Sequence, residues 1–161
     1  MKPFYLFILF GLNLYSYSQV VYDFTLVNPE NKSQSYEELN GEKFTIIDFW
    51  ATWCKPCQLS IPKINKIYNE YKEKGIEVIG ISIDNPRNRA KISPLIKALG
   101  IDYPVLLDTD QEVMQDFNVS SIPVLFIIDS NNKIIYTHEG YAPGDDIEIR
   151  KKLNELLSES E

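Results

Sequence analysis

The chain has 161 residues, of which 44% are hydrophobic and 24% are charged. That length supports one domain with its own hydrophobic core and is too short for two domains of ordinary size. The formal net charge is −7, and no run of Lys or Arg marks a face that could neutralise phosphates, so we expect no nucleic-acid partner.

The N-terminus reads MKPFYLFILFGLNLYSYSQV, in which one Lys precedes an apolar stretch over residues 3–14. Small residues then occupy the positions that a signal peptidase requires, which predicts a signal peptide over residues 1–18 with cleavage after Ser18. Residues 19–161 would form the mature domain, periplasmic or otherwise exported and soluble. The apolar stretch is shorter than the roughly 20 residues that cross a bilayer, although an uncleaved N-terminal membrane anchor is the alternative.

Strand-like and helix-like patterns alternate along the rest of the chain. Strands are expected at residues 20–28 (an edge strand), 43–51, 76–84, 103–108, 123–129 and 133–140, the last two as an antiparallel hairpin across a Ser-Asn-Asn turn. Helices are expected from about Cys54 to Gly75, at residues 86–99 with an interruption at Ser93-Pro94, at 111–117 and from 145 onward. This order predicts an α/β sandwich with a mixed central sheet covered by helices on both faces.

The segment FWATWCKPCQ (49–58) holds the chain's two cysteines, Cys54 and Cys57. A bridge across two residues closes so short a loop that it restrains the unfolded chain very little, so redox chemistry is a better reason for it than stability. Gln58 stands where a c-type haem site needs His, and two Cys with one distant His fall short of the four ligands of structural zinc. We therefore expect a redox-active Cys54–Cys57 disulfide without metal or other cofactor, the alternative being an inert surface bridge.

The position of the pair assigns a role to each cysteine. The preceding strand ends near Trp50, so Cys54 should lie at a helix N-terminus and Cys57 about one turn further along. Free N–H groups and the helix dipole favour the thiolate of Cys54, which makes it the nucleophile. Cys57 would resolve the mixed disulfide, and Pro56 fits the first helical turn.

Two other functions are alternatives to a disulfide oxidoreductase. A redoxin-type thiol peroxidase would carry Pro and Thr seven and three residues before its reactive cysteine, whereas Ile47 and Ala51 stand there. A non-catalytic module that binds extended peptides beside Pro123 would work equally well without either cysteine.

The stretch IIDFWATWCKPC (46–57) resembles the active-site strand and loop of the thioredoxin superfamily. With the signal peptide, the strand GISID (80–84) and the element YPVLLD (103–108), the chain is similar to exported TlpA/ResA-type thiol-disulfide oxidoreductases. The resemblance runs from about residue 20 to 157. It implies a thioredoxin-like fold with an extra N-terminal strand and a central strand/helix insertion.

The resemblance also implies roles for residues outside the cysteine pair. Pro123 would be cis and would present the backbone of Ile122 to an added substrate strand. Trp53, with Lys55 and Pro56 between the cysteines, would contact the substrate.

Asp48, six residues before Cys54, matches the buried acid of thioredoxins. A buried carboxyl holds its proton to higher pH and could exchange one with Cys57, unless Asp48 is a strand-end residue that reaches water. Cytoplasmic thioredoxins place a Lys near this acid, where this chain has Gly80. His138, the sole histidine, is expected to be a surface or hairpin residue.

The function expected from these residues is the reduction of disulfides in other exported proteins. The Cys54–Cys57 disulfide would then be reduced again by a membrane thiol electron donor. We expect the protein to act as a monomer.

Overall fold

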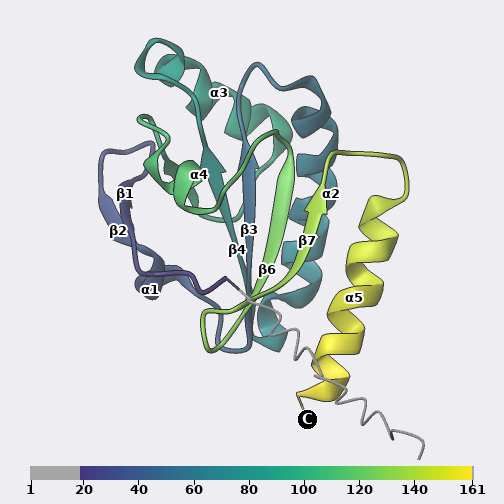
Figure 1. The fold of residues 1–161 in the computed structure, drawn as a ribbon. Helices are drawn as coiled ribbons and strands as arrows, with labels where there is room; N and C mark the ends of the chain where they lie inside the picture. Colours follow the sequence, from purple (N-terminus) through teal and green to yellow (C-terminus); the bar gives the residue numbers. More distant parts are fainter. Residues whose placement is uncertain (1–18, 161) are drawn as a thin grey trace, which may run out of the picture.

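A computed structural model describes residues 19–160, so the predicted signal peptide and its cleavage site lie outside the described residues. Within residues 19–160, no helix combines the length and the apolar character needed to cross a membrane. The strands are β1 (Thr25–Val27), β2 (Ser33–Ser35), β3 (Phe44–Trp50), β4 (Ile76–Ser82), β5 (Val105–Leu107), β6 (Val124–Asp129) and β7 (Ile134–Glu139). They form one sheet in the order β2-β1-β5-β4-β3-β6-β7 (Figure 1).

The sheet is mixed, with a parallel centre and antiparallel edges. Strand β4 runs parallel to β3 and β5, whereas β6 is antiparallel to β3 and pairs with β7 as the predicted hairpin. Because β3 and β4 are parallel, their carboxyl ends meet at one edge of the sheet, the upper edge in Figure 1. That edge is where α2 begins, and it carries the cysteines.

Helices cover the sheet as expected for the predicted sandwich. They are α1 (Tyr36–Leu39), α2 (Lys55–Tyr71), α3 (Arg89–Leu99), α4 (Glu112–Asp116) and α5 (Asp145–Glu159), with 3-10 turns at Lys72–Lys74 and Pro86–Asn88. Helix α2 contacts both α3 and α5, and Figure 1 shows α2 and α5 side by side. The mixed sheet covered by helices confirms the predicted α/β fold class.

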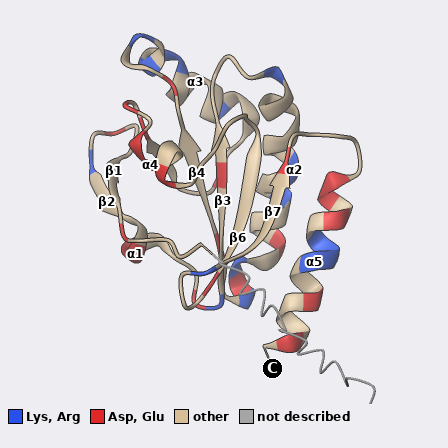
Figure 2. Cartoon of the chain, viewed as in Figure 1, with Lys and Arg blue, Asp and Glu red and all other residues tan. Residues whose placement is uncertain are grey.

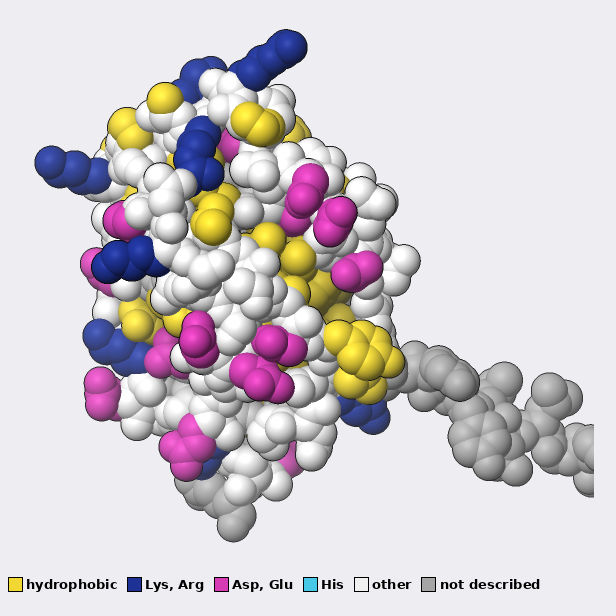
Figure 3. All heavy atoms as spheres, turned by 90° about the vertical axis from the view of Figure 1, so that its left-hand side faces the viewer, with side chains coloured by type: hydrophobic (Ala, Val, Ile, Leu, Met, Phe, Trp, Pro, Cys, Tyr) yellow, Lys and Arg dark blue, Asp and Glu magenta, His cyan; other side chains and the backbone are white. Residues whose placement is uncertain are grey.

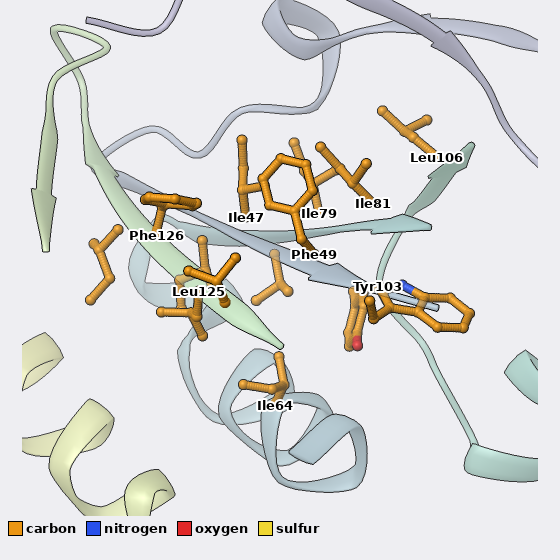
Figure 4. Packing of buried hydrophobic residues seen from close by; sticks show 14 of the residues in the cluster. Ile47, Phe49, Ile64, Ile79, Ile81, Tyr103, Leu106, Leu125 and Phe126 are labelled. Atoms are coloured by element: carbon orange, nitrogen blue, oxygen red, sulfur yellow. The ribbon is translucent and has the colours of Figure 1, made fainter. Parts of the chain in front are cut away.

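The two faces of β3 enter different surroundings, because successive side chains of a strand point to opposite sides. Ile47 and Phe49 lie on one side of the sheet, and Ile64 of α2 and Leu125 lie on the other (Figure 4). On the first side the ring of Phe49 packs 5.3 Å from that of Phe117, centroid to centroid. Every residue of β3 is buried, as its apolar sequence predicted.

The N-terminal region differs from the prediction of an edge strand at 20–28. Only Thr25–Val27 is a strand, and it lies inside the sheet because it pairs with β5 on one side and with β2 on the other. The edge on this side of the sheet is β2, which lies in a stretch where no strand was predicted. Ser35 then starts α1 through a capping box with Glu38. The polar composition of this stretch did not suggest a helix.

The predicted interruption at Ser93-Pro94 is wrong, because α3 is continuous through Pro94. Proline lacks the N–H that would bond the carbonyl of Ala90 four residues earlier. Both Ala90 and Pro94 are exposed, so water can solvate that carbonyl and the helix continues.

Charged side chains are spread over the surface. On the face shown in Figure 3, basic and acidic side chains are interspersed with apolar ones and form no continuous basic band.

Candidate active site

The two cysteines occupy the junction between β3 and α2. Cys54 is the N-cap of α2, and its Sγ accepts a hydrogen bond from the N–H of Cys57 at 3.2 Å. The two residues form a disulfide with their Cα atoms 5.3 Å apart. Pro56 lies in the first turn, where a missing N–H costs no helical bond. The first turn thus directs the N–H of Cys57 at the sulfur of Cys54, an arrangement that stabilises a thiolate.

The two sulfur-bearing residues differ in accessibility. Cys54 is 5% exposed and Cys57 is 0% exposed, so an incoming sulfur atom can reach only Cys54. Around it, Trp53 is 58% exposed, and Lys55 and Pro56 are exposed as well. An apolar and positively charged rim therefore surrounds the accessible edge of a buried disulfide.

The predicted cis proline is confirmed at the Ile122-Pro123 bond. Val124, the next residue, pairs with Phe49 in the register of β6 and β3, which places Pro123 near the end of β3 that leads to Cys54. Pro123 is buried and Ile122 is half-buried. Within residues 19–160, the backbone of Ile122 makes no hydrogen bond, so it is available to pair with another strand.

Asp48 lies in the middle of the sheet, paired with Gly80 of β4 and Leu125 of β6. It is 1% exposed, which excludes the alternative of a strand-end carboxylate that reaches water. Its Oδ2 has no hydrogen-bond partner within residues 19–160, and burial raises the pKa of its carboxyl to about 8. A carboxyl with this pKa can hold or release a proton near neutral pH.

Helix α2 lies over the side of the sheet that carries Asp48. Asp48, Pro123 and two α2 residues, Ser60 and Ile64, line one small pocket. Ser60 follows Cys57 by three residues and donates a hydrogen bond from its Oγ to the Cys57 carbonyl at 3.0 Å. Residues three apart share a helix face, so Cys57 and Asp48 belong to the same buried region.

Gly80 leaves no room for the basic side chain that cytoplasmic thioredoxins place near the acid. A Cβ at this position would lie 2.9 Å from Cε2 of Tyr103 and 3.1 Å from Nε1 of Trp50. Burial and the nearby Asp48 carboxylate raise the pKa of the Tyr103 hydroxyl well above its ordinary value. An aromatic ring therefore occupies the space beside Asp48.

A second buried carboxylate, Asp84, fixes the loop before Cys54. The backbone N–H and the hydroxyl of Thr52 both donate to Asp84 at 2.7 Å, and the hydroxyl of Ser82 donates to it at 3.0 Å. Sequence reasoning missed this contact, although one signal was present. Asp84 follows a buried strand parallel to β3, so its side chain had to meet the loop that follows β3.

His138 lies in the β6–β7 hairpin, as expected. It lies on β7 with its side chain 18% exposed, and its Nε2 is 3.0 Å from Oδ2 of Asp145 at the start of α5. Among residues 19–160, no group of three or more His, Cys, Asp or Glu side chains could hold a metal ion.

The chain is similar to known disulfide-exchange proteins. It is 29% identical over 126 residues to the thiol-disulfide oxidoreductase ResA of Geobacillus kaustophilus, a match covering 78% of this chain and 71% of the relative. The structure assigned as thiol:disulfide interchange protein DsbE from Chlorobium tepidum superposes with a TM-score of 0.78 at 25% identity, over 87% of this chain and 96% of that one. A thioredoxin-like protein of Porphyromonas gingivalis superposes with a TM-score of 0.71 at 39% identity, over 85% and 91% of the two chains.

Together with the cysteine pair at the start of α2, these relatives define the protein as a thioredoxin-like thiol-disulfide oxidoreductase. The model of the AhpC/TSA family matches residues 18–137. The chain belongs to the AhpC/TSA family.

Proposed function

We propose that this protein is exported and reduces disulfide bonds of other exported proteins, with Cys54 as nucleophile and Cys57 as resolving cysteine. The observation that carries this assignment is the position of Cys54. It caps α2 and accepts an N–H from its first turn, and it is the member of the pair with exposed surface.

The reaction proceeds in two exchanges of sulfur bonds. The Cys54 thiolate attacks one sulfur of the substrate disulfide, which forms a mixed disulfide and releases the other substrate sulfur as a thiolate that takes a proton from water. Cys57 then gives up its proton and attacks the Cys54 sulfur, and the second substrate sulfur leaves. Two electrons have passed to the substrate, and the Cys54–Cys57 disulfide of the present structure remains.

Asp48 is the proposed acceptor of the proton that Cys57 loses. With a pKa of about 8, its carboxyl lies close to the ordinary thiol value of about 8.5, so proton transfer in either direction is nearly balanced. The carboxylate of Asp48 would receive the proton in the resolving step. The neutral carboxyl would return it when the disulfide is reduced again.

The substrate is proposed to bind as an extended segment across Trp53, Lys55, Pro56, Ile122 and Pro123. The unpaired backbone of Ile122 supports addition of a substrate strand beside cis Pro123. Trp53 offers a large exposed apolar surface next to Cys54. This arrangement selects an accessible disulfide in a locally extended chain.

The source of electrons is proposed to be a thiol donor in the membrane, and the protein is proposed to work as a monomer. Export is supported by the signal-peptide pattern of residues 1–18. A thiol peroxidase is disfavoured because the two positions where it needs Pro and Thr hold Ile47 and Ala51, both 0% exposed.

Trapping of substrates tests the assignment of the two cysteines. A Cys57→Ser variant should accumulate mixed disulfides on Cys54, because the resolving thiol is missing. Mass spectrometry of non-reduced complexes would identify the trapped proteins, and Cys54→Ser is the matched control that should trap none. Partners trapped by Cys54→Ser but not by Cys57→Ser would reverse the assignment.

A further inference from the structure

The proposed proton acceptor has almost no contact with solvent. Asp48 is 1% exposed, yet its protonation state must follow the pH of the medium between one reaction and the next. Its Oδ2 has no partner within residues 19–160, so a second polar group must lie within reach of a connecting water molecule if protons are to enter and leave.

A pocket behind cis Pro123 meets this requirement. Its volume is about 20 Å³, and its polar lining includes Asp48, Ser60, His138 and Asp145. The pocket is mostly apolar, and a cavity of this measure can hold about one water molecule where two or more hydrogen-bonding groups face it. Asp48 and His138 supply a carboxyl and an imidazole to its lining.

The register of the sheet places Asp48 and His138 on the same side. Asp48 pairs with Leu125 of β6, and Leu125 pairs with His138 of β7. Residues paired directly across strands point to the same face, and two strand spacings amount to about 10 Å. Figure 4 shows Leu125 on the side of the sheet that carries Ile64 of α2. His138 thus forms the outer wall of the pocket, and Asp48 forms its inner wall.

Charged and titratable groups from four parts of the chain line the same pocket as His138. They are Asp48 on β3, Lys63 on α2, Tyr141 in the connection after β7, and Asp145 and Asp146 in the first turn of α5, where Figure 2 shows a cluster of acidic residues.

Of the two carboxylates, Asp145 is the one that contacts the imidazole of His138. Asp146 is engaged by Nη1 of Arg150 at 2.7 Å, whereas Asp145 lies 3.0 Å from Nε2 of His138. Oδ2 of Asp145 also accepts the N–H of Ala142, which fixes the carboxylate in place. An imidazole oriented by a carboxylate can take a proton on one nitrogen and release one from the other.

We propose that His138, held by Asp145, is the positioning residue through which Asp48 exchanges its proton with solvent across the pocket behind Pro123. This proposal rests on the proposed role of Asp48. After the resolving step the proton from Cys57 leaves Asp48 through the pocket to the imidazole and then to water. When an electron donor reduces the disulfide, a proton follows the reverse route, and no electrons move along it.

The test measures the resolving step by rapid mixing of the reduced protein with a small neutral disulfide between pH 6 and 9 at low buffer concentration. His138→Ala should slow this step roughly a hundredfold, the low end of what general acid–base groups contribute. Added imidazole should restore the rate, because it can enter the vacated space and carry protons. His138→Gln should also slow the resolving step. Tyr136→Phe, a change two residues earlier on β7, should leave its rate unchanged.

The possible outcomes separate this proposal from the proposed function. An unchanged resolving step in His138→Ala, or a slow step that imidazole does not restore, would overturn the relay. If Asp48→Asn leaves the resolving step unchanged, the role of Asp48 itself is wrong. If the relay operates, His138→Ala should add no further slowing in the Asp48→Asn background, because both changes break one route.

Discussion

Asp48 lies on β3 and Asp84 follows the neighbouring parallel strand β4, and both carboxylates are buried, but their surroundings differ. Asp84 is 0% exposed and accepts three hydrogen bonds from Thr52 and Ser82. Asp48 is 1% exposed, its Oδ2 has no partner within residues 19–160, and its pKa is raised to about 8. Burial alone therefore does not make a carboxyl chemically active.

The difference lies in where the hydrogen-bond donors are. Loop N–H and hydroxyl groups converge on Asp84 at the edge of the sheet, so its charge is compensated and its contacts fix the loop before Cys54. Asp48 lies further inside, flanked by Gly80 and Leu125, which offer it no side-chain donor. The contacts of Asp84 order the loop before Cys54, whereas Asp48 is the proposed proton acceptor.

The largest effect should come from removing the charge of Asp48. Its carboxyl has a pKa of about 8 in the folded protein and of 3.8 in the unfolded chain, so the folded state binds one more proton between these values. Stability is therefore greatest below about pH 4 and falls as the pH rises toward 8. Asp48→Asn should remove this loss of stability and raise the free energy of unfolding on the order of 5 kcal/mol at pH 8.

Urea unfolding of the disulfide form at pH 4, 6 and 8 checks this expectation. The gain of Asp48→Asn over the wild type should vanish at pH 4 and grow with pH. Parallel stability profiles for the two proteins would show that the carboxyl of Asp48 is not held neutral by the fold.

Replacing Asp84 should change the stability in the opposite direction. Asp84→Ala should destabilise the protein by about 3 kcal/mol, because it leaves the Thr52 N–H and two hydroxyls without their charged acceptor. Thr52→Val removes only one hydroxyl and should cost about 1 kcal/mol. Denaturant melts of both single variants and of the double variant would measure the coupling. Additive losses would mean that Thr52 and Asp84 do not act as one contact.

The smallest effect tests the aromatic ring beside Asp48. The Tyr103 hydroxyl is buried without a partner within residues 19–160, so Tyr103→Phe should leave stability unchanged or raise it by about 1 kcal/mol. The matched control is Tyr71→Phe, which removes a hydroxyl bonded to Asn154 at 2.9 Å and should lose about 1 kcal/mol. Thermal melts compare the stabilities of the two variants. A clear loss of stability in Tyr103→Phe would indicate that the Tyr103 hydroxyl has an internal hydrogen-bond partner.

Much of the site could be predicted from local sequence because its parts are close in the chain. Cys54, Pro56 and Cys57 fall within one helical turn. Their relative positions therefore follow from the end of the strand at Trp50 and the start of the next helix. The apolar run of β3 likewise predicted its complete burial, Asp48 included. These features depend on the spacing of hydrophobic residues and on helix capping, and both are determined by residues close together in the sequence.

Other parts depend on pairing between distant segments. Thr52 and Asp84 are bonded although they lie 32 residues apart in the sequence. His138 lies on the same side of the sheet as Asp48 because both residues are aligned with Leu125 of β6, which lies between them. The expected edge strand also became an inner strand once β2 paired with it.

The sequence by itself determined the redox pair, the helix that carries it and the class of fold, because these follow from local spacing and hydrophobic period. The tertiary structure decided which buried carboxyl is satisfied, where the sole histidine lies and what fills the space beside Gly80. Strand order and register set those distances, and no local pattern encodes them.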